Sequence, residues 1–298
     1  MKIFSGIRGL TEAKAMVYAL LLVAIIASSY SFGASLAGER AKSAAPAAGK
    51  ISGQLIINGS SPMVPMITEI AKRFEALHPG TQIEVNNVGA VQGLKDLREG
   101  KASIAMMGRA LNDMETDLVS YPVARDAVCG IVHRDNPIKV LTSLQVADIH
   151  VGRIVNWSQV GGRDATIDVI NGVAGSGGVD LFARYFNIKY DQIKARMVQR
   201  DESDRIKTVA ENRNAISYVS ISLAERNRKA GVPIKLLPAE GVSATAKTLR
   251  SGNYPISRPM TLVTLGTANE LTRTFIRYTL SRNVTATIEK HDFVPYAD

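Results

Sequence analysis

The chain is nearly without cysteine: Cys129 is the only one among 298 residues. One thiol cannot form a disulfide framework within the chain, and it cannot build a cysteine-based metal cluster. Cys129 lies in the apolar run Ala127–Val132, which predicts a buried, unreactive thiol rather than a redox or catalytic one.

The chain also has few histidines, and its lysines and arginines are not clustered. The four histidines are scattered, without the i, i+4 pairing of a helical metal site, so no metal and no cofactor is expected. Lysine and arginine exceed the acids by 36 to 27, giving a formal charge of +9, yet they form no long run and do not alternate with aromatic residues. A nucleic-acid groove is therefore not expected. The excess is consistent with a solvated surface or with attraction of anionic ligands.

The N-terminus has the pattern of an export signal. Lys2, Arg8 and Lys14 precede an uncharged stretch, and Ser35-Leu36-Ala37 fits a cleavage site before Gly38. We expect a signal peptide at 1–37 and a flexible leader at 38–50, which places the protein in the periplasm or elsewhere outside the cytoplasm. An uncleaved membrane anchor is the alternative, because the uncharged stretch is about long enough to span a bilayer.

After residue 50, short apolar runs alternate with amphipathic stretches, a rhythm that predicts an α/β fold with mixed, mostly parallel sheets flanked by helices. The expected strands are Leu55–Asn58, Ile83–Val88, Ile104–Met107, Ala127–Val132, Ile167–Asn171, Ile216–Val219 and Met260–Leu265. The expected helices are Pro62–Leu77, Gln92–Glu99, Ser143–Ile149, Gly178–Phe186, Ile206–Glu211, Ser222–Lys229 and Asn269–Ser281.

Three strand-to-helix junctions are rich in glycine or serine. Ser60 and Ser61 precede Pro62, with Ser61 the expected N-cap; the other two junctions are Gly89-Ala90 and Gly175-Ser176-Gly177-Gly178. The start of a helix offers unpaired N–H groups and the positive end of a dipole, and such ends bind phosphate-like anions. Each junction alone is compatible with ordinary helix capping. Three in one α/β chain indicate a shared oxyanion site.

Two further interpretations concern single side chains. Arg109 is the expected charged partner of an anion, because its guanidinium can hold an oxyanion through two hydrogen bonds; the alternative is an ion pair with a nearby acid such as Asp113. Ser176 also approximates the serine turn of hydrolases, with His291 as a later base. That interpretation, a serine hydrolase, is the less favoured one.

The motifs along the chain resemble those of the phosphate-binding proteins of bacterial phosphate import. The densest block runs from VARDAVCGIVHRDNP through LTSLQVADIHVGRIVNWSQVGG to GSGG, within residues 123–178. AISYV at 215–219, YPISRP at 254–259 and FVP at 293–295 continue the similarity.

The resemblance implies a two-lobed type II periplasmic-binding-protein fold that binds its ligand in the cleft between the lobes. Residues 51–133 plus 237–298 would form lobe I, and residues 134–236 would form lobe II. It further implies a non-enzymatic, monomeric solute-binding protein that captures phosphate or a related oxyanion and delivers it to the membrane permease of an ABC importer. The implied ligand loops contain Ser60, Ser61, Gly89, Ala90, Arg109 and Gly175–Gly178.

Several side chains depart from the pattern of this family. The family commonly has serine where Ala90 stands, arginine at Gly172 and threonine at Gly178. These departures remove hydrogen-bond donors. They leave open an alternative function, in which the protein keeps the fold but acts as a partner-binding or sensory module and binds no phosphate.

Overall fold

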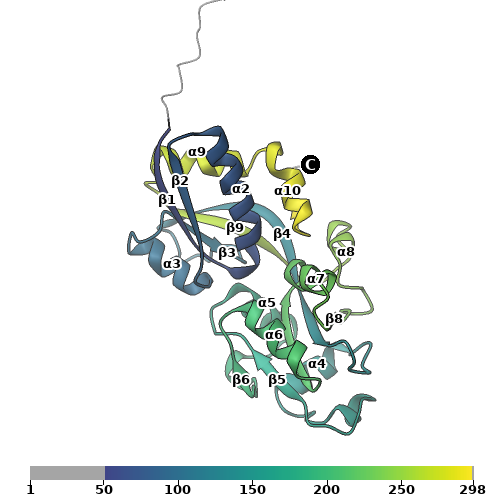
Figure 1. Ribbon diagram of the computed structural model, residues 1–298. Helices are drawn as coiled ribbons and strands as arrows, with labels where there is room; N and C mark the ends of the chain where they lie inside the picture. The colour runs from purple at the N-terminus through teal and green to yellow at the C-terminus, as the bar shows by residue number, and fades with distance from the viewer. Residues whose placement is uncertain (1–50, 297–298) are drawn as a thin grey trace, which may run out of the picture. The chain divides into compact units, whose positions relative to one another are not determined.

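A computed structural model describes residues 51–296 of the chain (Figure 1). The expected signal peptide and leader, residues 1–50, lie outside the described residues. Within residues 51–296, no helix combines the length and the apolar character that crossing a bilayer requires.

The first half of the sheet is built from strands joined by helices. β1 (Gly53–Gly59) pairs in parallel with β2 (Thr81–Asn87) and with β3 (Ile104–Met107). The connections are the 3-10 turn η1 (Ser61–Met63) with helix α2 (Val64–Leu77), and helix α3 (Ala90–Arg98). Helix α2 forms because apolar residues recur every three or four positions, so one face packs against the sheet.

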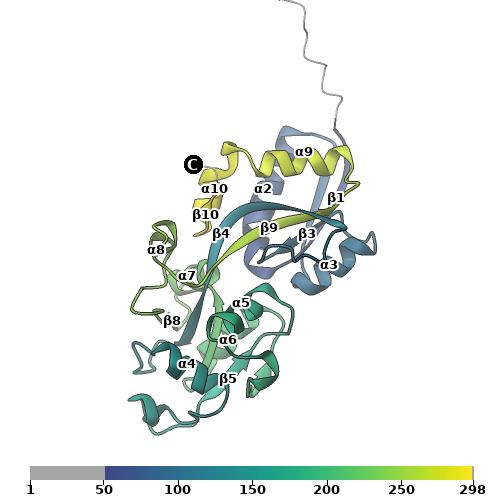
Figure 2. The ribbon, with the colours of Figure 1, turned by 180° about the vertical axis from the view of Figure 1, so that it is seen from behind.

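Two antiparallel strands link the halves. The sixteen-residue strand β4 (Leu118–His133) pairs with β9 (Ser257–Leu265) through Ala127, and from Val128 onward it pairs with β7 (Ala215–Ser220). Figure 2 shows β4 and β9 side by side between the two halves of the fold. Only the stretch Ala127–Val132 was expected as a strand. The earlier part escapes the sequence pattern because Ser120, Pro122 and Arg125 interrupt its apolar residues, and the pairing register shifts after Pro122.

The second half of the sheet continues from β7 through β5 (Asp168–Asn171) to β6 (Met197–Val198) with parallel pairing, while β8 (Ile234–Leu236) lies antiparallel to β4. The whole sheet has the order β2-β1-β3-β9-β4-β7-β5-β6, so the mixed α/β class is confirmed. The remaining elements are α4 (Ser143–His150), η2 (Trp157–Val160), α5 (Gly177–Tyr185), η3 (Tyr190–Gln192), α6 (Glu202–Glu211), α7 (Ile221–Lys229), α8 (Ala246–Arg250), α9 (Glu270–Thr279), η4 (Arg282–Val284), α10 (Thr285–Lys290) and β10 (Val294–Pro295).

Each half has its own apolar core. In the first, Phe74 of α2 packs edge-on against Phe275 of α9. In the second, the ring of Phe182 stacks on Tyr218 with 3.8 Å between centroids. Cys129 is fully buried in the second core, as predicted, and burial raises the pKa of its thiol well above the ordinary value.

Candidate anion-binding site

At the first predicted junction the backbone packs closely against Met106 and is hydrogen-bonded to it. A β-carbon at Gly59 would lie 2.3 Å from the carbonyl oxygen of Met106, so only glycine fits there. The N–H of Ser60 donates to that same carbonyl at 3.0 Å. Ser60, not Ser61, is the N-cap, because the chain enters a 3-10 turn one residue earlier than the proline suggested. The expectation for Ser61 as the cap was therefore wrong.

The second junction lies against the first. Gly89 has a φ of 78°, a conformation that favours glycine, and its N–H donates to the carbonyl of Gly59 at 3.0 Å. A β-carbon at Gly93 would lie 2.6 Å from the carbonyl oxygen of Asn58. The first bond inside helix α3 runs from the N–H of Gly93 to Gly89, so the N–H groups of residues 90–92 have no partner within the helix.

The third junction starts helix α5. The hydroxyl of Ser176 donates to the carbonyl of Val173 at 3.0 Å and does not cap the helix. The first bond inside the helix is from Asp180 to Ser176, which leaves the N–H groups of residues 177–179 without a partner in the helix. Asp180 also lies in this first turn, and burial raises the pKa of its carboxyl.

Within residues 51–296, helices α2, α3, α5 and α10 begin without a side-chain cap, and the other α-helices begin with one. Helices α4, α6, α7, α8 and α9 each begin with a side chain that accepts a backbone N–H: Thr142, Asp201, Ser220, Thr245 and Asn269. Helices α3 and α5 begin with none. An uncapped helix start retains N–H donors for a ligand.

The uncapped starts of α3 and α5 line one pocket. Its volume is about 190 Å³, and its walls are residues 88–92, residues 173, 174 and 176, and Arg200. Three of the predicted residues, Gly89, Ala90 and Ser176, are therefore brought together. Arg200 was not predicted, because it lies in a loop of the other half of the fold and no motif surrounds it.

Arg109 lies outside that pocket. Its guanidinium holds Glu115 through two hydrogen bonds of 2.6 and 2.7 Å, and it also donates to the carbonyl of Ala110. Asp113, the acid expected in the alternative, is thus not its partner. The hydrogen bond to Arg109 lowers the pKa of Glu115 below its ordinary value. Arg109 lines a larger cavity of about 490 Å³ together with Gly175 and Gly177.

Gly177 and Gly178 bring α5 close to other loops. A β-carbon at Gly177 would lie 2.5 Å from the carbonyl oxygen of Gly108, so the third junction packs directly on the loop that precedes Arg109. Gly178 lies against Arg258, which is buried between Asp126 at 3.2 Å and Glu202 at 3.4 Å. Arg258 is a structural residue in this arrangement, because two carboxylates occupy its guanidinium.

The space beside Gly172 is filled by an arginine from helix α6. A β-carbon at Gly172 would lie 2.9 Å from Nη1 of Arg205 and 2.5 Å from a methyl group of Val179. That guanidinium donates to the carbonyl of Gln199 and lies 3.7 Å from Glu202. No longer side chain at position 172 could be accommodated without repacking.

The triad suggested for a hydrolase is not assembled. Nε2 of His291 lies 3.0 Å from the carboxylate of Glu69, a residue of helix α2. The Ser176 hydroxyl instead donates to Val173. Within residues 51–296, none of the histidines forms a hydrogen bond with Ser176, so this serine has no imidazole base.

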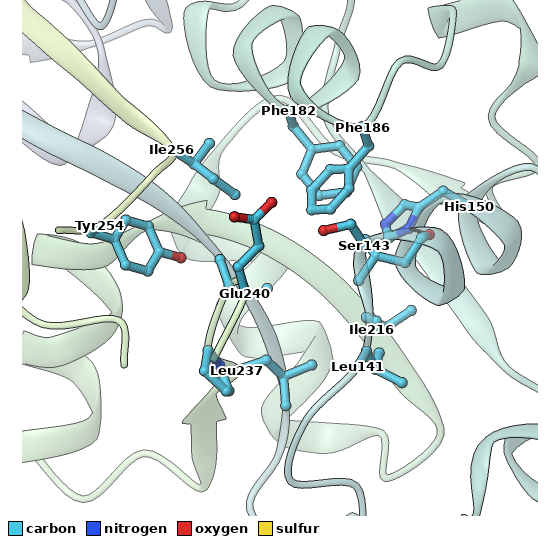
Figure 3. A pocket seen from close by; sticks show the side chains of 14 residues that line it. Leu141, Ser143, His150, Phe182, Phe186, Ile216, Leu237, Glu240, Tyr254 and Ile256 are labelled. Carbon is cyan, nitrogen blue, oxygen red and sulfur yellow. Dashed lines mark hydrogen bonds between the residues drawn. The ribbon is translucent and has the colours of Figure 1, made fainter. Parts of the chain in front are cut away.

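A separate cavity lies in the second half, away from these junctions (Figure 3). It holds only about 20 Å³, enough for one water molecule, and it is lined mainly by apolar side chains such as Phe182 and Phe186. His150 lies on its wall with Nδ1 2.8 Å from the carbonyl of Val146 and with Nε2 unpartnered. Burial lowers the pKa of His150 to about 4, so its ring is neutral near pH 7.

Comparison with known proteins agrees with this geometry. Residues 44–283 match the family described as the PBP superfamily domain. The chain is 28% identical over 271 residues to the phosphate-binding protein PstS of Bacillus subtilis, covering 88% of each chain. It is 25% identical over 272 residues to the phosphate-binding protein PstS of Pseudomonas aeruginosa, covering 82% of this chain and 84% of that one.

Solved structures give the same result. A crystal structure from Clostridium perfringens, of a protein assigned as a phosphate ABC transporter substrate-binding protein with bound phosphate, is 29% identical with a TM-score of 0.76. It covers 82% of this chain and 99% of that one. An ABC-type phosphate transport receptor from Vibrio cholerae is 27% identical with a TM-score of 0.65, covering 82% of this chain and all of that one, 100%. The resemblance drawn from the sequence is confirmed, and the chain belongs to the PBP superfamily domain family.

Proposed function

We propose that this protein captures phosphate, or a closely related oxyanion, and delivers it to the membrane permease of an ABC importer. The observation that carries the proposal is the pocket at the uncapped starts of α3 and α5. Backbone N–H groups that lack a helical partner beside such a pocket, together with two positive dipole ends, favour an oxyanion over a neutral ligand. The named function of the relatives in Bacillus subtilis and Vibrio cholerae supports the same ligand.

In this proposal the anion lies against Gly89, Ala90 and the Gly175–Gly178 segment. Ser60, Ser61 and Arg109 remain predicted members of the site. Residues 51–133 plus 237–298 act as one lobe and 134–236 as the other, and closure of the lobes around the ligand presents a surface to the permease. The protein binds without catalysing a reaction, works as a monomer, and is exported by the signal at its N-terminus.

The alternative is a partner-binding or sensory module that takes no phosphate. It is favoured by one observation: the N–H groups of Ser60 and Gly89 already donate to protein carbonyls. Those two donors are unavailable to a ligand unless the loops rearrange.

Titration calorimetry distinguishes the two. The purified protein, freed of ligand by unfolding and refolding, is titrated with phosphate and then with sulfate and arsenate. Phosphate binding at micromolar or lower concentration supports the importer proposal. No heat with any oxyanion, from a sample with folded circular dichroism, contradicts it and favours the partner-binding module.

A further inference from the structure

The charges around the proposed anion pocket are unevenly distributed. Of the residues that line it, only Arg200 carries a charge; no aspartate or glutamate faces this cavity. The remaining walls are apolar side chains, the Gln92 amide, the Ser176 hydroxyl and the backbone at the starts of two helices. The pocket therefore carries positive potential from one guanidinium and two helix dipoles.

Arg200 is held at this position by contacts from across the fold. It lies between β6 and α6, and its Cγ and Cδ lie 3.3 Å from where a β-carbon of Gly89 would stand. The next residue, Asp201, accepts a hydrogen bond from the side-chain amide of Asn87. These two contacts hold the segment 200–201 against the loop that begins α3, so the aliphatic part of Arg200 rests on the N-cap of that helix.

The guanidinium of Arg200 has no bonding partner among the described residues. Arg200 is exposed to solvent, and in the part of the chain that the structure describes it has neither a hydrogen-bond partner nor an ion-pair partner. The arginines around it differ: Arg109 is held by Glu115, Arg205 donates to Gln199, and Arg258 lies between two carboxylates. Their charges are already neutralised or engaged by the protein, whereas that of Arg200 is available.

We propose that Arg200, whose side chain lies against the N-cap of α3, is the charged residue that binds the anion in this pocket. The inference rests on the proposed function and adds to it the residue that supplies the counter-charge. A guanidinium offers two parallel N–H donors to the oxygens of an oxyanion, while the N–H groups of α3 and α5 reach the remaining oxygens.

The test is calorimetry with inorganic phosphate on the purified protein and three variants. Arg200→Gln keeps the aliphatic contact with Gly89 but removes the charge, and we expect it to weaken binding roughly 10- to 100-fold. Arg200→Lys keeps the charge but lacks the two parallel N–H donors of a guanidinium, so its phosphate affinity should lie between those of Arg200→Gln and the unaltered protein. Arg213→Gln is the matched control, because this exposed arginine pairs with Asp135 in the same half; its affinity should equal that of the unaltered protein.

A thermal melt of each ligand-free variant completes the test. Because the guanidinium of Arg200 has no protein partner, Arg200→Gln should melt at the same temperature as the unaltered protein. Phosphate affinity of Arg200→Gln within twofold of the unaltered protein would overturn the inference and leave the proposed function standing. A lowered melting temperature in that variant would also overturn it, because the residue would then hold the fold together. If the unaltered protein binds no phosphate, both proposals fail.

Discussion

The guanidinium of Arg258 lies directly against the backbone of Gly178: a β-carbon at position 178 would stand 2.7 Å from Nη1 of Arg258 and 3.3 Å from Oε1 of Glu202. Glycine at this second position of helix α5 therefore makes room for a buried ion pair that connects strand β9 with helix α6. The same contact couples the start of α5, where the anion is proposed to bind, to the charged interior of the fold.

Replacing that glycine should destabilise the protein. Gly178→Thr, which introduces the residue common in the phosphate-binding family, would push the guanidinium away from Asp126 and Glu202 and should lower the free energy of unfolding by about 1–3 kcal/mol. Gly266→Thr is the control, because a β-carbon at Gly266 would meet nothing within 4 Å. Urea unfolding measures both; equal midpoints for the two variants would contradict the packing argument.

A negative charge at the start of α3 should weaken phosphate binding without lowering the stability of the protein. Ala90→Asp places a carboxylate in the proposed anion pocket, and repulsion should weaken phosphate binding at least 10-fold. The same carboxylate complements the helix dipole, so the melting temperature should stay the same or rise.

The matched control is Leu144→Asp. Leu144 is 68% exposed in the first turn of α4, which Thr142 caps, so the net charge and the helix position change in the same way. Its phosphate affinity should match that of the unaltered protein. Equal affinity of Ala90→Asp and Leu144→Asp would place the anion elsewhere.

The pair Arg109–Glu115 should contribute stability that depends on pH. Arg109→Gln leaves the buried carboxylate of Glu115 with the N–H of Asn112 alone, and should cost about 1–3 kcal/mol at pH 7. Because Arg109 lowers the pKa of Glu115 from its ordinary 4.5, this contribution is present above pH 4.5 and is lost as pH falls further.

The measurement is the difference in unfolding free energy between the unaltered protein and Arg109→Gln at pH 7 and pH 3. We expect the difference to shrink at pH 3. Arg98→Gln, which breaks the exposed pair with Asp117, should cost less than about 1 kcal/mol at pH 7. A difference for Arg109→Gln that grows toward low pH would refute the assignment.

His150 should make the fold sensitive to acid. Burial lowers its pKa from 6.5 to about 4, so the unfolded chain takes up a proton between these values before the folded protein does. Stability should therefore fall as pH drops from about 6.5 to 4, by up to roughly 3 kcal/mol. In His150→Leu this part of the loss should disappear; parallel stability curves for the two proteins across that window would show that His150 is not responsible.

Much of the fold could be predicted from local patterns. The apolar spacing of helix α2 and the short apolar runs of β3 and β7 appear in the sequence because each element must bury one face against the sheet. The glycine and serine clusters at 89–90 and 175–178 marked the helix starts that line the pocket, because an uncapped start needs residues that let a ligand approach the main chain. The motifs within residues 123–178, together with those at 215–219, 254–259 and 293–295, indicated the family.

By itself, then, the sequence determined the α/β class, the position of most helices and strands, and the family, since these follow from periodicity and from local motifs. Only the tertiary structure decided which charges are available. The sequence analysis expected Arg109 to bind the anion, yet in the folded protein its guanidinium is hydrogen-bonded to Glu115. Arg200 had no motif, yet the fold places its side chain against Gly89, more than a hundred residues earlier in the chain. A side chain's availability depends on its partners in space, and those partners come from segments that no local pattern connects.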